Sequence, residues 1–244
     1  MNEIEFIQKM TEPNNTKIVM LILDGLGGLP RTPDGLTELE TARRPNMNAL
    51  ASQSALGLTI PVTYGLTVGS GPGHLGIFGY DPIEHQIGRG ALETLGVDFD
   101  LSPDDVAGRG NFCTFDKNGI VVDRRGGRLS TPESMKLAKI LNNIKIEGAQ
   151  IFVEPVKEHR FAFVLRGEGF GANLTDGDPL KNGYAPLEIE GRDAPSKKAA
   201  KLINEFIHKA CAALCEESPA NGIMLRGFDK LPVLPKYQDI FKLN

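Results

Sequence analysis

Asp24 is the first residue whose type and position could carry out chemistry. It follows the apolar run Lys17 to Leu23 and is itself followed by glycines. A carboxylate at the carboxyl end of a strand, where the backbone is free to bend away, is well placed to bind a hard or borderline metal ion. The alternative is that Asp24 only caps the loop or a helix.

The segment Gly69-Ser-Gly-Pro-Gly-His74 places a hydroxyl group between two glycines, directly before a predicted helix. It is neither a Walker A loop nor a Gly-x-Ser-x-Gly nucleophile elbow. Backbone N–H groups at a helix N-terminus attract phosphate, and an unshielded serine there could act as a nucleophile. No His/Asp base is needed when a metal ion binds the oxygen, because coordination lowers the pKa of the hydroxyl. The alternative is a glycine-rich turn in which Ser70 has no role.

The elements that must position these two residues follow an alternating order. The run from Lys17 to Leu23 and the segment from Leu56 to Ile60 are typical of strands covered on both faces. Between them, Pro45 opens a predicted helix that reaches Ser54. The glycine-rich segment leads into another helix, and a further one over 90–95 ends at Gly96. This β-α-β-α order favours a mostly parallel α/β sheet.

The composition changes after Asp98, and the pattern becomes that of a separate α+β unit. Asp116-Lys-Asn-Gly119 predicts the turn of a hairpin. A stripe of apolar residues from Ala199 to Leu214 predicts a helix that begins near Ser196. The other predicted elements are the hairpin strands 106–115 and 120–123, a helix over 132–141, and strands over 151–156 and 160–166.

The composition of the 244 residues excludes several classes of protein. A hydrophobic share of 41% is enough to build a core, and a net charge of −4 argues against a general nucleic-acid binder. The longest apolar run is far shorter than a membrane span, and the N-terminal segment has no apolar signal region. Three cysteines without a Cys-x-x-Cys spacing suit a reducing compartment. We therefore expect a cytoplasmic protein that binds neither membrane nor nucleic acid.

Long motifs across nearly the whole chain after residue 16 resemble the archaeal-type cofactor-independent phosphoglycerate mutases of the alkaline phosphatase superfamily. The segment Gly69-Ser-Gly-Pro-Gly-His-Leu-Gly-Ile-Phe-Gly-Tyr-Asp-Pro82 is the most specific of them. The other matching segments are 17–28, 37–45, 88–93, 109–112, 123–128, 158–161 and 173–179.

The resemblance implies an isomerase of glycolysis and gluconeogenesis that interconverts 3- and 2-phosphoglycerate without 2,3-bisphosphoglycerate. Ser70 matches the nucleophile that forms a phosphoserine, and Asp24 matches a ligand that, with Ser70, holds one of two divalent metal ions. Manganese is expected, with Mg²⁺, Co²⁺ or Zn²⁺ as alternatives. The implied fold is the N-terminal part of an alkaline-phosphatase-like, mostly parallel α/β sheet with an inserted α+β domain. The expected limits are 1–98 for the first part, 99–228 for the insert and 229–244 for a return segment.

The inserted domain is expected to bind the carboxylate and phosphate of the phosphoglycerate, because guanidinium groups match both anions bidentately. An exposed arginine can also be no more than surface charge. The candidate arginines are Arg124, Arg125, Arg128, Arg160 and Arg226, and His159 and Asp178 are the candidates for orienting the glycerate hydroxyls.

One Asp and one Ser cannot fill a two-metal site, and in the family the remaining ligands come from a long C-terminal segment. We therefore expect the N-terminal portion of the enzyme, with its C-terminal half or a second copy of the chain as candidate partners. Two alternatives stay open: a non-catalytic or split-enzyme fragment that binds phosphorylated acids, and a phosphatase of the same superfamily.

Overall fold

The computed structural model describes residues 3–23, 25–66 and 69–243, without the side chain of Ser70. The chain divides into two compact units, Met1–Tyr64 with Pro235–Asn244, and Gly65–Leu234. The expected domain limits at residues 98 and 228 stay a prediction. No helix in the described residues is long and apolar enough to cross a membrane.

The first unit contains short helices, and two of them, α1 and α8, pack together. A capping box starts α2, in which Thr37 and Glu40 each bond to the other's backbone N–H. The predicted helix at Pro45 forms, but it ends at Ala51 rather than Ser54. The helices of this unit are α1 (Glu3–Met10), α2 (Glu38–Thr41), α3 (Pro45–Ala51) and α8 (Tyr237–Phe241).

The two strands expected over 17–23 and 56–60 do not form in this structure. Their apolar side chains face solvent, and Val19 is 90% and Leu58 104% exposed. A strand of this kind is stable only where neighbouring strands supply hydrogen bonds and helices bury both faces. No strand pairing is present for either segment within the described residues, so their apolar character alone does not make them strands.

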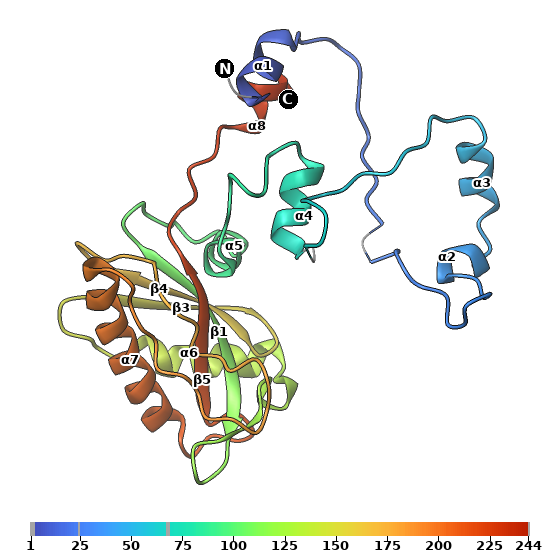
Figure 1. The fold of residues 1–244 in the computed structure, drawn as a ribbon. Coiled ribbons are helices and arrows are strands. Elements are labelled where there is room, and N and C mark those ends of the chain that lie inside the picture. The colour runs from blue at the N-terminus through green and yellow to red at the C-terminus, as the bar shows by residue number, and fades with distance from the viewer. Residues whose placement is uncertain (1–2, 24, 67–68, 244) are drawn as a thin grey trace. The chain divides into compact units, whose positions relative to one another are not determined.

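The second unit is built on an antiparallel sheet in the order β2-β1-β4-β3, with β5 also paired to β1 (Figure 1). The mixed α/β class is confirmed, and the sheet of the described residues is that of the α+β unit. The predicted hairpin and both further strands form, whereas β5 was not predicted. The strands are β1 (Val106–Phe115), β2 (Val121–Asp123), β3 (Gln150–Lys157), β4 (Arg160–Arg166) and β5 (Gly222–Asp229).

One face of this sheet is buried under α6 (Thr131–Asn142) and α7 (Ala194–Leu214). The predicted stripe on α7 is confirmed, since Ile203 and Phe206 are fully buried in the main core. The N-cap of α7 is Asp193 rather than Ser196, because its carboxylate accepts the backbone N–H of Ser196 at 2.8 Å. A short 3-10 turn, Gly126–Arg128, precedes α6.

The helix α5 (Arg89–Leu95) packs against β1, β4 and β5. It ends at Gly96, as predicted. The preceding helix, α4 (Ser70–Ile77), begins at the glycine-rich segment. The position of α5 against these strands determines which side chains of the sheet can form a site.

Candidate functional site

Two arginines on neighbouring strands lie directly opposite each other in the sheet. Arg109 of β1 pairs with Arg226 of β5, and Asn111 of β1 pairs with Arg160 of β4. Residues two apart on a strand share a face, so all three arginines lie on one face of the sheet. Like charges directly opposite each other are destabilising unless negative groups compensate them. The register therefore concentrates positive charge that needs a counter-charge.

Glu93 of α5 supplies part of that negative charge. Its Oε1 atom lies 3.4 Å from Nε of Arg109 and 3.3 Å from Nη1 of Arg160. The Glu93 side chain is 13% exposed. One carboxylate thus contacts arginines from two different strands.

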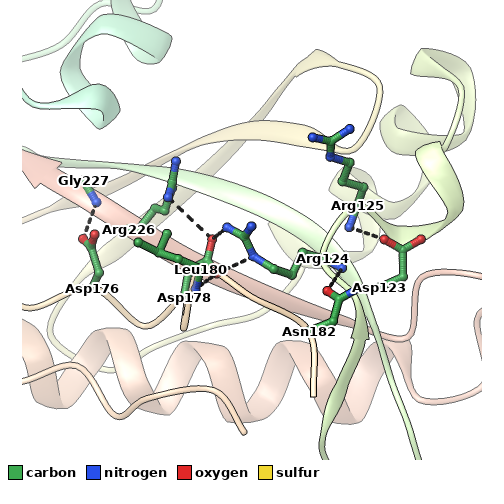
Figure 2. Close-up of polar contacts among 9 residues, drawn as sticks. All are labelled: Asp123, Arg124, Arg125, Asp176, Asp178, Leu180, Asn182, Arg226 and Gly227. Carbon is green, nitrogen blue, oxygen red and sulfur yellow. Dashed lines mark hydrogen bonds and ion pairs between the residues drawn. The ribbon is translucent and has the colours of Figure 1, made fainter. Parts of the chain in front are cut away.

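Asp178 supplies a second negative group, and Figure 2 shows it between Arg124 and Arg226. Arg124 donates to both of its carboxylate oxygens, from Nε at 2.9 Å and from Nη2 at 2.6 Å. Nη1 of Arg226 lies 3.8 Å from Oδ2 of Asp178, and the N–H of Leu180 donates to Oδ1 at 2.9 Å. The Asp178 side chain is 1% exposed, so these contacts satisfy a buried charge.

Burial and mutual repulsion act on the arginines of the sheet. Burial lowers the pKa of Arg109, and Glu93 opposes that shift while Arg226 adds to it. Burial also lowers the pKa of Arg226, against the opposing effect of Asp178. Both guanidinium groups stay charged at neutral pH. Nε of Arg226 is buried without a hydrogen-bond acceptor among the described residues, which leaves a donor for an anion, whereas Nε of Arg109 has only its ion pair with Glu93.

These arginines line a cavity of about 1070 Å³ within the second unit. Gly69 and Gly71, the neighbours of Ser70 in sequence, line the same cavity. The charged residues of the lining include Arg89, Glu93, Arg109, Arg160, Asp176 and Arg226. The start of α4 and the face of the sheet that carries Arg109, Arg160 and Arg226, the basic face, therefore line the same cavity.

The predicted site residues differ in where the structure places them. Asp24 and the side chain of Ser70 lie outside the described residues. Arg124, Asp178 and Arg226 form one ion-pair group, and Arg160 lines the cavity beside Glu93.

Three further predicted residues, Arg125, Arg128 and His159, are absent from the described lining of the cavity. Arg125 and Arg128 are exposed. The Arg125 side chain extends away from the Arg124–Asp178 pair (Figure 2). His159 is buried beside Glu158, at 3.9 Å, and burial together with Arg125 lowers its pKa.

Sequence reasoning missed Arg89, Glu93 and Arg109 as members of the site. On its predicted strand Arg109 lies between two glycines and two residues before Asn111, so the alternation of side chains along a strand places Arg109 and Asn111 on the same face. Arg89 and Glu93 are four residues apart and therefore share a face of α5. Both patterns are visible in the sequence, but neither indicates that this face of the strand and this face of α5 contact each other.

The described residues contain no group of three or more His, Cys, Asp or Glu side chains positioned to hold a metal ion. They thus supply no donor set against which the expected two-metal site can be built. The pair Asp24 and Ser70 remains a prediction from the resemblance.

The model of the 2,3-bisphosphoglycerate-independent phosphoglycerate mutase family matches residues 51–221, which include most of the basic face and the glycine-rich segment. The chain belongs to this family. The resemblance carried by the motifs is therefore confirmed, and the family is by its description independent of 2,3-bisphosphoglycerate.

Curated members of the phosphoglycerate mutase family match almost the entire chain. A probable 2,3-bisphosphoglycerate-independent phosphoglycerate mutase of Thermotoga neapolitana is 48% identical over 98% of this chain and 60% of its own length. One from Thermus thermophilus is 45% identical over 98% of this chain and 59% of its own length. The chain thus spans about 60% of the length of these relatives.

Solved structures are similar as well. A Pyrococcus horikoshii protein superposes with a TM-score of 0.65 and 31% identity, over 85% of this chain and 50% of its own. The cofactor-independent phosphoglycerate mutase from Thermoplasma acidophilum gives a TM-score of 0.58 and 29% identity, over 69% of this chain and 48% of its own.

Proposed function

We propose that this chain supplies the substrate-binding part, and Ser70, of a phosphoglycerate mutase that interconverts 3- and 2-phosphoglycerate in glycolysis and gluconeogenesis. The observation that carries the proposal is the cavity in which Arg109, Arg160 and Arg226 lie with the glycines on either side of Ser70. The reaction is an isomerisation in the cytoplasm, and it uses no 2,3-bisphosphoglycerate.

The charge of the cavity suits a small acid with two anionic groups. Phosphoglycerate carries a carboxylate and a phosphate, and guanidinium groups bind either one through parallel hydrogen bonds. The buried Nε donor of Arg226 gains an acceptor when such a ligand binds. The arginines bind and orient the substrate, and their charge stabilises the phosphoryl group during transfer.

Ser70 is the proposed acceptor of the phosphoryl group. The bond from phosphorus to one glycerate oxygen breaks as a bond from phosphorus to the serine oxygen forms; the serine hydroxyl loses its proton and the released glycerate oxygen gains one. The phosphoryl group then passes to the neighbouring glycerate hydroxyl, which loses its proton as the serine oxygen regains one. A divalent ion, when bound, would activate the hydroxyl; Asp24 and Ser70 are its proposed ligands. The described residues supply no further donor set for that ion.

The test separates binding from turnover in the same preparation. Isothermal titration of the chain with 3-phosphoglycerate should show binding, and Arg226→Ala should weaken it about tenfold or more, the usual cost of a charged hydrogen bond. Arg192→Ala is the control, because Arg192 is exposed and outside the described cavity lining. Equal affinity of the Arg226→Ala variant, or no binding by the unaltered chain, would overturn the proposed site.

Turnover is followed by phosphorus NMR after Mn²⁺ and 3-phosphoglycerate are added. Appearance of 2-phosphoglycerate that is lost in Ser70→Ala supports the mutase. Release of inorganic phosphate instead indicates a phosphatase of the same superfamily. Binding without either product indicates that the chain acts as a binding part and needs its C-terminal half or another partner for the reaction.

A further inference from the structure

Glu93 makes an unusual set of contacts for a residue in a basic cavity. A single oxygen of its carboxylate lies within 3.4 Å of guanidinium nitrogens from both Arg109 and Arg160. The two arginines come from neighbouring strands, so the carboxylate of one helix links two strands of the sheet. Because the Glu93 side chain is only 13% exposed, solvent screens these ion pairs weakly.

The charge balance explains why this carboxylate matters. Arg226 and Arg160 both act on Arg109 with positive charge, and Glu93 acts on it with negative charge. Without Glu93, the guanidinium groups of Arg109 and Arg160 would repel each other across a half-buried space. Turning either guanidinium group toward solvent would then lower the free energy of the chain. An anion that binds between them needs both groups held in the cavity at once.

The backbone that carries Glu93 is fixed to the same strands. Gly90, one turn earlier in α5, contacts the backbone of Gly108 in β1. The N–H of Gly88 at the start of the helix donates to the carboxylate of Asp229 at 2.5 Å, and that residue ends β5. The carboxylate is therefore held on a rigid element, which is what a residue needs to hold its neighbours in place.

We propose that Glu93 is a positioning residue that holds Arg109 and Arg160 together as one receptor for an anionic group of the substrate. This inference rests on the proposed function. Glu93 does not attract the substrate, since its own charge opposes that of the ligand. Its contribution is the arrangement of the two guanidinium groups before the ligand arrives.

The direction of the effect distinguishes positioning from simple charge. Glu93→Gln keeps the size of the side chain and makes the cavity more positive by one charge. Charge alone then predicts tighter binding of an anion, whereas loss of positioning predicts weaker binding. We expect Glu93→Gln to weaken the binding of 3-phosphoglycerate about tenfold, and Glu93→Asp to recover part of the loss. Glu205→Gln is the matched control, because it removes the same charge from an exposed ion pair on α7.

Arg160→Gln provides a second variant, which remains informative if Glu93→Gln folds poorly. When Glu93 acts through Arg160, the double variant should bind no more weakly than the weaker single variant. Independent, additive losses in the two single variants would contradict the proposal. Nitrogen NMR of the arginine Nε–H groups adds a direct signature. The Arg109 resonance should shift or broaden in Glu93→Gln, while the backbone resonances of β1 stay in place.

The outcomes separate this inference from the function on which it rests. If the unaltered chain binds neither 3-phosphoglycerate nor inorganic phosphate, the proposed function fails, and this inference fails with it. If the unaltered chain binds and Glu93→Gln binds equally well or more tightly, the proposed function stands and the positioning role of Glu93 is overturned.

Discussion

Gly90 of α5 and Gly108 of β1 are in direct backbone contact. A methyl group added at Gly90 would lie 2.5 Å from the Cα atom of Gly108 and 2.6 Å from the carbonyl oxygen of Ala107. No side chain can move aside to relieve this overlap, because the opposing atoms belong to the backbone of a central strand. The helix that carries Glu93 can approach the sheet this closely only with glycine at position 90.

Gly90→Ala should therefore push α5 away from the sheet. We expect the free energy of unfolding to fall by about 1–3 kcal/mol, as for other overpacked positions, and the affinity for 3-phosphoglycerate to fall as well. Urea denaturation and calorimetric titration measure the two effects. Gly57→Ala is the control, because a methyl group there meets no atom within 4 Å. Equal stability of both variants would show that α5 does not depend on this contact.

Asp178 should make the stability of the chain depend on acid pH. Burial opposes its ionisation, but the hydrogen bonds from Arg124 and Leu180 dominate, and the pKa of Asp178 is lowered in the folded chain. Its stabilising contribution is therefore fully present above the unfolded pKa of about 3.9 and is lost as the pH falls through the lower folded value.

Asp178→Asn should thus lose about 1–3 kcal/mol at pH 7, since it leaves Arg124 and Arg226 without their counter-charge. The same variant should show a smaller further loss than the unaltered chain between about pH 4 and the folded pKa of Asp178. Chemical denaturation at a series of pH values measures both effects. Parallel curves for the two proteins would mean that Asp178 does not titrate with unfolding.

The three cysteines should differ sharply in reactivity. Burial raises the pKa of Cys113 and that of Cys211, so little thiolate forms at either residue at neutral pH. Cys215 is exposed. Iodoacetamide at pH 7.5 should label Cys215 first and Cys113 only after denaturation, as peptide mass spectrometry can show. Rapid labelling of Cys113 in the folded chain would contradict its burial in the sheet.

Hydrogen exchange should separate the expected strand at 17–23 from β4. The apolar residues of the first segment are exposed, and no strand pairs with them in the described residues. In β4, Phe163 is fully buried and its strand is paired on both sides. We expect amides of 17–23 to exchange orders of magnitude faster than those of β4. Comparable protection would show that the first segment is paired in solution.

The sequence alone was sufficient to predict a helix or a strand wherever a local pattern of residues defines that element. The Asn-Gly turn predicted the β1–β2 hairpin, and the stripe that includes Ile203 and Phe206 predicted α7 and its buried face. Turn chemistry and the periods of strands and helices act over a few residues, so they can be recognised without knowledge of the fold. The long glycine-rich motif around Ser70 likewise indicates the family through residue types and spacing alone.

Only the tertiary structure decided which residues share the cavity. Arg109 and Arg226 are far apart in the chain and become neighbours through the register of β1 and β5. Glu93 joins them because α5 packs against those strands. The segment 17–23 has apolar residues that are suited to a strand, but no strand among the described residues pairs with it. Pairing and packing depend on residues distant in sequence, and a local pattern contains no information about which distant residues those are.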